Sequence, residues 1–291
     1  MMEINETLKK QLLLFQKSEI TEYHIYQNLA KANKSPENRR IMEMIAEDEL
    51  KHARLWKKYT GQEVKPRGFS VWFYTLLSKV FGFTFAIKLM EMGEENAQEH
   101  YKKLIGKISE IDIFLEDENK HEEILIDMLD EESLRYAGSV VLGLNDALVK
   151  LTGALAGFTL ALQNTKLIAL TGLITGIAAA LSMAASEFLA TRAEDTGKNP
   201  AKASLYTGVA YIMTVAILIL PYLLIQNYYV ALALTLSAAV MIIAFFNYYI
   251  SVAKGEPFRR RFLEMAGISL SVAALSFIIG YFIRSVFGID I

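Results

Sequence analysis

The chain of 291 residues contains no cysteine. Without thiols it can form no disulfide bond, no iron–sulfur cluster and no thiolate metal site, and no cysteine can serve as a nucleophile. Any metal must therefore be held by oxygen and nitrogen. The first residues, MMEINETLKKQLLLFQKSE, also lack the long apolar core of a cleaved secretory signal, so we expect the N-terminus to begin on the cytosolic side.

Charge is scarce in the second part of the chain. Residues 1–135 hold 25 of the 32 acidic and 20 of the 30 basic side chains. Residues 136–291 are instead dominated by Leu, Ala, Ile, Val and Gly in runs of about 20 residues or more, the length that crosses a bilayer as a helix. The net charge of −2, without a basic stripe, argues against nucleic acid as a partner. We therefore predict a soluble domain over residues 1–135 and a membrane domain over residues 136–291.

Five apolar segments of the membrane domain are long enough to span a bilayer. They are residues 136–162, 167–190, 205–225, 228–252 and 265–287. The connections after the second and fourth segments carry several Lys and Arg residues, whereas the other two connections hold a single Lys between them. By the positive-inside rule the basic connections face the cytosol, which places residues 1–135 in the cytosol and the C-terminus on the other side.

A sixth apolar stretch, residues 69–90, reads FSVWFYTLLSKVFGFTFAIKLM and is interrupted by Lys79 and Lys88. If it crossed the membrane, two charged motifs on either side of it could not share one site. We therefore predict an amphipathic segment at the cytosolic membrane interface, with Trp72 and its two aromatic neighbours turned toward the lipid. A place in the core of the soluble domain, or a contact between two copies, fits the pattern equally well.

These two charged motifs are EDELKH at residues 47–52 and EDENKH at residues 116–121. Each follows an upstream segment in which a Glu precedes a Tyr by seven positions, and this recurrence indicates an internal repeat. The upstream pairs are Glu19 with Tyr26, and Glu94 with Tyr101. We expect four helices, with breaks near Pro36 and at residues 61–68.

Glu and His three residues apart on a helix point in one direction. Four inward-facing helices, two that supply a Glu and two that supply Glu-x-x-His, form the ligand set of carboxylate-bridged di-iron and di-manganese bundles. Such ligands suit iron, manganese or zinc. We expect the acidic neighbours within the motifs, among them Asp48 and Asp117, to form a solvated helix face.

On these motifs, residues 1–135 resemble the rubrerythrin branch of the ferritin-like superfamily. The resemblance implies a four-helix bundle with a di-iron centre, in which Tyr26 and Tyr101 hydrogen-bond to ligating carboxylates. The ligands that it implies are Glu19, Glu49, His52, Glu94, Glu118 and His121. Rubrerythrins also carry a four-cysteine rubredoxin iron, which this chain cannot form, so their internal electron supply is missing.

Two carboxylates interrupt the apolar segments. An ionised side chain within the membrane costs at least about 2.5–3.5 kcal/mol, so Asp146 and Glu187 are candidate functional residues. The first two segments form an antiparallel hairpin that turns near Asn164, which places Asp146 level with Met183 and Glu187 one turn nearer the cytosol. These groups would line a path for a ferrous ion. The structural alternative is an ion pair of Asp146 with Lys150, four residues further on.

Residues 136–291 resemble the vacuolar iron transporter family. The similar segments are GLNDALV, SMAASEFLA and TGVAYIMTVAILILPYLL in the first three spans. The resemblance implies a five-helix transmembrane bundle that forms homodimers and moves ferrous iron or manganese in exchange for protons, with Asp146, Met183 and Glu187 in the translocation path.

The combined prediction is an all-α membrane protein, with a ferritin-like four-helix bundle followed by a five-helix transmembrane bundle, that exports ferrous iron from the cytosol. The bundle would capture or sense the metal. The alternative is a membrane-anchored di-iron ferroxidase or peroxidase. An inert anchor, however, needs neither Asp146 nor Glu187 in its apolar helices, which favours transport.

Overall fold

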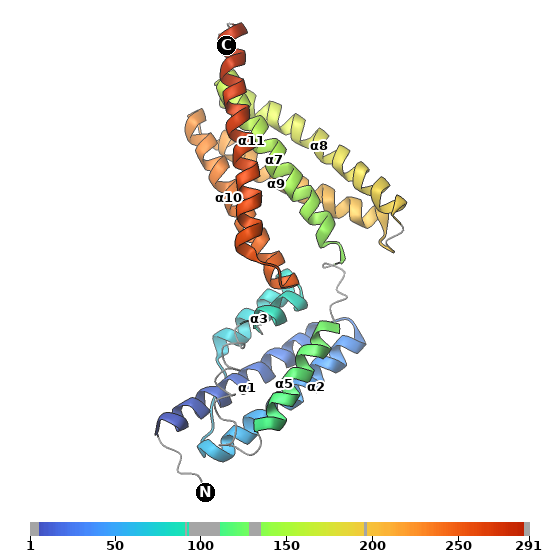
Figure 1. Ribbon diagram of the computed structural model, residues 1–291, viewed down its shortest axis with the longest axis vertical. Coiled ribbons are helices and arrows are strands. Elements are labelled where there is room, and N and C mark those ends of the chain that lie inside the picture. The colour runs from blue at the N-terminus through green and yellow to red at the C-terminus, as the bar shows by residue number, and fades with distance from the viewer. Residues whose placement is uncertain (1–5, 91, 93–110, 128–134, 195–196, 288–291) are drawn as a thin grey trace. The chain divides into compact units, whose positions relative to one another are not determined.

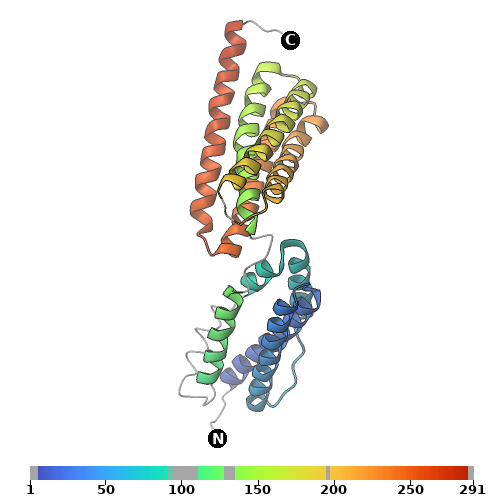
Figure 2. The ribbon, with the colours of Figure 1, turned by 90° about the vertical axis from the view of Figure 1, so that its right-hand side faces the viewer.

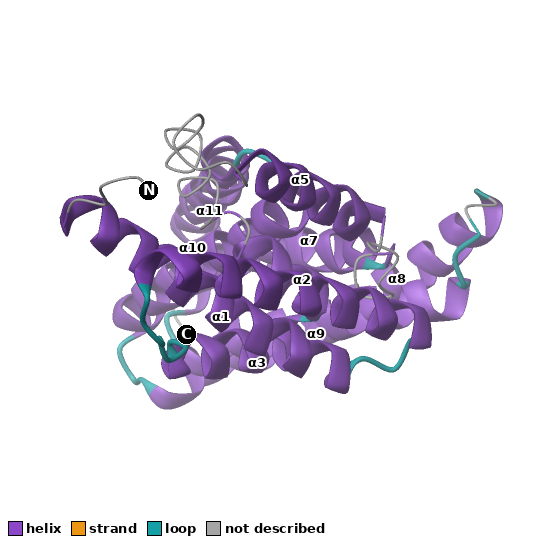
Figure 3. Ribbon diagram, turned by 90° about the horizontal axis from the view of Figure 1, so that it is seen from below, coloured by secondary structure: helices purple, strands orange, loops and turns teal. Residues whose placement is uncertain are grey.

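The computed structural model describes residues 6–90, 92, 111–127, 135–194 and 197–287. Within these ranges every regular element is a helix, as the colours of Figure 3 show. The predicted all-α fold class is therefore confirmed for this part of the chain. By its internal contacts the chain divides into two compact units, residues 1–131 and residues 132–291 (Figure 1).

The N-terminal unit is built from long helices that pack side by side. Its described elements are α1 (Glu6–Ala32), α2 (Pro36–Thr60), α3 (Gly68–Phe81), a short helix over residues 83–90, and α5 (Ile111–Asp127). Helices α1 and α2 form an antiparallel hairpin, α3 packs on α1, and α5 packs on α2. The predicted helix that carries Glu94 and Tyr101 lies outside the described residues, so the four-helix bundle stays a prediction.

Helix α2 begins and ends where its sequence specifies. The Ser35 hydroxyl accepts a hydrogen bond from the backbone N–H of Asn38 (3.3 Å), and Pro36 occupies the first turn, where no backbone N–H is needed. Gly61 ends the helix in the left-handed conformation (φ 67°), with its N–H donating to the carbonyl of Lys57. Both breaks agree with the sequence.

The apolar core of this unit consists of two clusters, and polar side chains separate them along α1, α2 and α5. One contains Leu12, Phe15, Trp56, Ile111 and Phe114. The other lies nearer the opposite ends of the same helices and contains, among others, Ile25, Leu29, Met42, Ile45 and Leu125. On α1, α2 and α5 alike, the predicted ligands fall between the positions that build the two clusters. The acidic and histidine side chains thus form a polar layer between two apolar layers, which keeps water out.

The second unit contains five helices that are long and apolar enough to cross a membrane. They are α7 (Ala137–Leu162), α8 (Thr165–Ala193), α9 (Pro200–Leu224), α10 (Tyr228–Lys254) and α11 (Phe258–Phe287). This confirms the prediction of a multi-pass membrane protein with five spans. Three asparagines cap the starts of α8, α9 and α10: the side chains of Asn164, Asn199 and Asn227 accept hydrogen bonds from backbone N–H groups in the first turn of each helix.

Helix α7 contacts each of the other four helices of this unit. Small residues allow these close approaches: a side chain at Gly143 would collide with the backbone carbonyl of Thr207 on α9, and one at Gly280 on α11 would collide with the carbonyl of Gly157. Figure 2 shows α11 running along one side of the bundle, next to α7. The helix that carries Asp146 is therefore the best packed of the unit.

Candidate metal centre and membrane carboxylates

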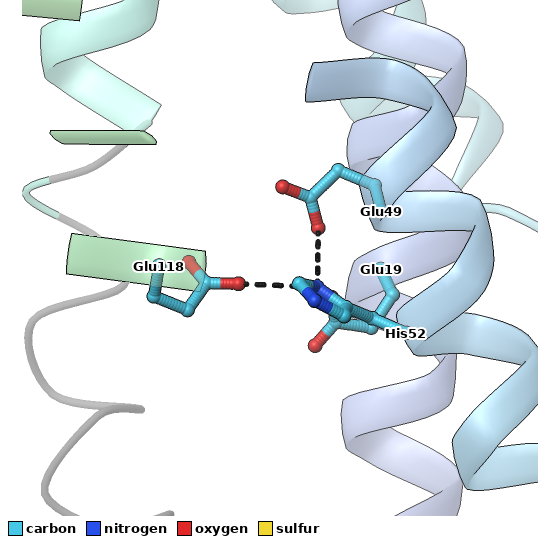
Figure 4. Close-up of side chains that lie close together, drawn as sticks. All are labelled: Glu19, Glu49, His52 and Glu118. Atoms are coloured by element: carbon cyan, nitrogen blue, oxygen red, sulfur yellow. Dashed lines mark ion pairs between the residues drawn. The ribbon is translucent and has the colours of Figure 1, made fainter. Parts of the chain in front are cut away.

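Three helices of the N-terminal unit bring four predicted ligands together. Glu19 comes from α1, Glu49 and His52 from α2, and Glu118 from α5 (Figure 4). Each offers one ligand atom, and these atoms all lie within 4.8 Å of one another. The side chains of Glu19, Glu49 and His52 are almost fully buried, with 1%, 3% and 5% of their surface exposed. Ionisable groups at this depth need a charged partner to be stable.

His52 lies at the centre of the cluster. Its Nδ1 atom is 3.5 Å from Glu19 Oε2, 3.6 Å from Glu49 Oε2 and 3.3 Å from Glu118 Oε1. One ring nitrogen can donate at most one hydrogen bond. Four buried atoms of the cluster have no hydrogen-bond partner of normal geometry among the described residues. They are both ring nitrogens of His52, Glu49 Oε2 and His121 Nδ1. A metal cation, which takes several such atoms as ligands at once, fits this donor set.

The Glu49 carboxylate faces two imidazoles. Its Oε2 approaches Nδ1 of His52, and its Oε1 lies 3.3 Å from Nδ1 of His121. The centroids of the two imidazole rings are 6.1 Å apart. A carboxylate that turns one oxygen toward each of two histidine ligands is placed to bridge two cations, as in carboxylate-bridged bundles. The arrangement therefore fits a dinuclear metal site.

Two acidic residues expected on a solvated face contact the histidines instead. His121 Nε2 lies 3.3 Å from Asp48 Oδ2, and His52 Nε2 lies 3.6 Å from Asp117 Oδ2. The pairing is reciprocal, because each Asp immediately precedes the Glu of one motif and faces the His of the other. The Asp48 contact is a hydrogen bond, whereas Asp117 lies at ion-pair distance from His52. A carboxylate beside the outer nitrogen of a histidine favours a proton on that nitrogen and leaves the other nitrogen free to bind a metal. The recurrence of the Asp in both motifs was the sequence signal for this role.

Aromatic side chains close the cluster on one side. The indole N–H of Trp56 donates to Glu19 Oε1 (3.4 Å), and the ring of Phe114 lies 4.6 Å from that of His52. Trp56 and Phe114 also contact each other edge to face, with centroids 5.4 Å apart. The sequence motifs did not indicate either residue. Their packing makes the site a dry one.

The dry surroundings and the shared charges shift the pKa values of the cluster. Burial, with a contribution from the nearby charge of Glu49, raises the pKa of Glu19 to about 7. Burial also raises the pKa of Glu118. Burial acts to lower the pKa of His52, but the carboxylates of Glu118 and Glu19 outweigh it and raise the pKa. The same balance, with Glu49 as the closest carboxylate, raises the pKa of His121. Without metal the cluster thus retains protons that a metal cation would displace.

Three predicted residues of the N-terminal unit remain: Tyr26, Glu94 and Tyr101. Tyr26 is buried on α1, with 4% of its surface exposed, and packs in the same apolar cluster as Ile25 and Leu29. Glu94 and Tyr101 lie outside the described residues. A hydrogen bond from Tyr26 or Tyr101 to a ligating carboxylate stays a prediction.

In the membrane unit, Asp146 contacts side chains from two helices. Lys150 Nζ lies 2.9 Å from Asp146 Oδ1, so the ion pair named above as the structural alternative is present. From α9, the hydroxyl of Tyr211, a residue with only 1% of its surface exposed, also interacts with the Asp146 carboxylate. Tyr211 lies in the third apolar segment, but the sequence does not predict that it contacts Asp146.

Glu187 is held by the start of the preceding helix. The Ser139 hydroxyl donates to Glu187 Oε1 (2.5 Å), and Thr207 on α9 donates in turn to the Ser139 carbonyl (2.9 Å). The contact sets the register of the hairpin: equal steps from Ser139 and Glu187 put Asp146 level with Ala180. Met183, which is partly buried, therefore lies between the levels of Glu187 and Asp146, rather than level with Asp146 as expected.

Comparison with known protein families gives one finding for the membrane unit. Residues 137–197 match the model of the VIT family. The matched segment contains Asp146, Met183 and Glu187. Together with the five apolar helices, it supports a multi-pass membrane protein that transports metal ions. No curated protein and no solved structure matches the chain.

Proposed function

We propose that this protein exports ferrous iron from the cytosol, with manganese as an alternative cargo, in exchange for protons. The N-terminal unit captures or senses the metal. The observation that carries the proposal is the largely buried cluster of Glu19, Glu49, His52 and Glu118 in a chain of which residues 137–197 match the VIT family. A chain with a carboxylate and histidine metal centre outside the membrane and carboxylates within its spans has the parts for collecting and moving a divalent cation.

The N-terminal centre is proposed to hold two metal ions, preferably iron. Glu49 would help to hold both ions, and His52 and His121 would contribute their Nδ1 atoms, a set supported by the distances from the Glu49 oxygens to the two rings. Asp48 and Asp117 orient the two rings. Bound iron would supply redox chemistry. Glu19, with its raised pKa, holds a proton in the metal-free centre and releases it when a cation arrives.

In the membrane unit, Glu187 is proposed to receive the ion, Met183 to contact it next, and Asp146 to pass it on. Ser139 orients the Glu187 carboxylate toward the path. Lys150 neutralises Asp146 while no metal is bound, and it must move away when a cation takes its place. Alternate binding of metal and protons by the two carboxylates couples export to proton uptake.

The proposed orientation rests on the basic residues near the ends of the spans. Most Lys and Arg residues of the membrane unit lie at the end of α8 and the start of α9, or at the end of α10 and the start of α11, which supports placing these helix ends, and the N-terminal unit, in the cytosol. A homodimer is proposed from the resemblance to vacuolar iron transporters.

The test is metal flux in proteoliposomes that contain the full-length protein and a fluorescent metal indicator. Asp146→Asn is expected to lose iron flux, and an opposing pH gradient is expected to accelerate flux through the parent protein. Glu264→Gln is the matched control, because this acid also lies on a membrane helix but is exposed and paired with Arg260. Iron flux at the parent rate through Asp146→Asn would refute the transport path. Iron and manganese in competition identify the preferred cargo.

The same buried cluster also favours a second candidate, a membrane-anchored ferroxidase or peroxidase. Carboxylate-bridged iron centres of this type react with oxygen species, and such a role needs no membrane path. It predicts iron oxidation that is abolished by Glu49→Gln and unchanged by Asp146→Asn, together with no flux in either protein. Assays of metal flux and of iron oxidation therefore distinguish the transporter from the oxidase or peroxidase.

A further inference from the structure

Helix α3 exposes a row of large apolar side chains. Phe69, Trp72, Leu76 and Val80 are 74%, 58%, 42% and 62% exposed. Their spacing of three, four and four residues places them on one face of the helix. The other large apolar residues that are exposed in the described part of the N-terminal unit, Leu14, Met44 and Met92, form no such row. We call these four side chains of α3 the apolar stripe.

The apolar stripe is not the packing face of α3. A different face of this helix meets the bundle: Val71 and Tyr74 pack against the cluster that contains Ile25 and Leu29. On the same side, the amide of Asn28 on α1 donates to the hydroxyl of Thr75 (3.3 Å). Helix α3 is thus fixed to the N-terminal unit by one face, and the four side chains of the apolar stripe remain exposed beside that face.

The stretch of chain that contains α3 carries charges of one sign only. Between Glu63 and Glu91 the chain contains no acidic residue, although residues 1–135 carry 25 acids in total. The same stretch carries four cations: Lys65, Arg67, Lys79 and Lys88. Three of them are exposed and Lys88 is half-buried. An exposed apolar face on a stretch whose only charges are basic is complementary to a bilayer with anionic headgroups, since long Lys and Arg side chains reach the headgroups while the apolar face enters the lipid.

A cavity of about 480 Å³ adjoins the apolar stripe between α3 and α1. Trp72 and Leu76 line both the cavity and the stripe, and His24, Asn28 and Lys79 contribute the polar part of its wall. The cavity adds an irregular hollow to the exposed apolar face. Flexible acyl chains can fill such a hollow, whereas a rigid partner helix would leave part of it empty.

We propose that α3 binds the surface of an anionic bilayer, with the apolar stripe in the headgroup region. The bilayer is always within reach, because the same chain carries five helices that can span a membrane. A second copy of the protein is the less suitable occupant. A two-fold contact would bring together two copies of a stretch, residues 64–90, that carries four basic residues and no acid.

Tryptophan fluorescence tests this contact, because the chain holds only two tryptophans, Trp56 and Trp72. Trp56 is fully buried in the bundle and cannot reach lipid. The full-length protein is reconstituted in vesicles of phosphatidylglycerol and phosphatidylcholine, the latter brominated near the headgroup end of its acyl chains. We expect the bromine atoms to quench the emission of the parent protein and this quenching to be lost in Trp72→Phe. Equal quenching of both proteins, or no quenching of the parent, would overturn the proposal.

A pair of matched variants separates the stripe from exposed apolar residues in general. Leu76→Asp on α3 is expected to reduce the quenching of Trp72, whereas Leu14→Asp, at a residue of α1 that is 56% exposed, is expected to leave it unchanged. Quenching should also weaken when phosphatidylglycerol is omitted. If Trp72 emission instead responds to protein density in the membrane and not to brominated lipid, the stripe is a contact between copies and the proposal is wrong. None of these outcomes depends on metal transport.

Discussion

Asp117 and Asp48 lie outside the proposed set of ligands and contact the histidines of the candidate metal centre. Each lies within 3.6 Å of the outer nitrogen of a histidine on the other motif, and its charge favours a proton on that nitrogen rather than on the one that faces the cluster. Without it, His52 could turn or carry its proton on Nδ1. Histidine ligands whose rings are free to turn bind metal more weakly, because ordering the rings on binding costs free energy.

We therefore expect Asp117→Asn to weaken metal binding by the full-length protein about 10- to 100-fold, the usual effect of removing such a partner. Titration with ferrous or manganous ion, followed by the quenching of Trp56 emission in a Trp72→Phe background, measures the affinity. Glu116→Gln is the control, since Glu116 is exposed and pairs only with Lys120 in the part of the chain that the structure describes. An unchanged affinity in Asp117→Asn would show that the histidine needs no such partner.

The raised pKa values of the cluster predict a dependence of stability on pH. Glu19 has its pKa raised from 4.5 to about 7 in the folded, metal-free protein, so its contribution to stability is full below the unfolded value and is lost as the pH rises through the folded one. The raised pKa values of Glu118, His52 and His121 act with the same sign. The metal-free N-terminal unit should therefore become less stable between about pH 5 and about pH 8.

Thermal unfolding of the detergent-solubilised protein in the Trp72→Phe background, followed by Trp56 emission with a metal chelator present, measures this loss. Glu19→Gln should flatten the dependence, because the amide does not titrate, whereas Glu43→Gln at an exposed position of α2 should not. Bound metal should reverse the slope, since it requires the deprotonated carboxylates. A metal-free midpoint that rises with pH would contradict the assignment of buried, proton-holding carboxylates.

At the scale of helices, the sequence was most informative where the pattern repeats. The two motifs predicted that α2 and α5 present Glu and His on one face, and the structure brings three of these residues together with Glu19. Asp48 and Asp117 were missed because an acid in a charged helix normally faces solvent. Only the packing of one motif against the other gives these two acids a histidine partner.

The hairpin of α7 and α8 shows how precisely a sequence can place a turn. The turn is predicted near Asn164 and Thr165, and the structure has it at Gln163 and Asn164: α7 ends at Leu162, and Gln163 adopts a left-handed conformation with φ of 49°. Asn164 then caps α8. Moving the turn toward the N-terminus shifts the level of Asp146 from Met183 to Ala180. Sequence patterns place turns with an uncertainty of a few residues, and in a hairpin such an error passes to every pair across it.

At the scale of the whole molecule, the chain joins a candidate metal centre, with largely buried ligands, to helices that can span a membrane and that carry carboxylates. If the centre captures cargo for export, it should raise the occupancy of the membrane path at low metal concentration and should matter little once the path is saturated. Loss of the centre would then raise the iron concentration at half-maximal flux and leave the maximal rate unchanged. A centre that senses iron and gates the path would lower the maximal rate when lost.

Glu49→Gln distinguishes these roles, because Glu49 faces both histidines and its loss should remove the bridging ligand. Under the capture role we expect the half-saturating iron concentration in proteoliposomes to rise about 10-fold or more, as for other changes at metal ligands, with the same maximal flux. Glu47→Gln, two residues away on the exposed side of α2, is the control. If Glu49→Gln alters neither value although its metal content falls, the N-terminal unit serves neither role in transport. The two units would then act independently, which would favour the oxidase function for the bundle.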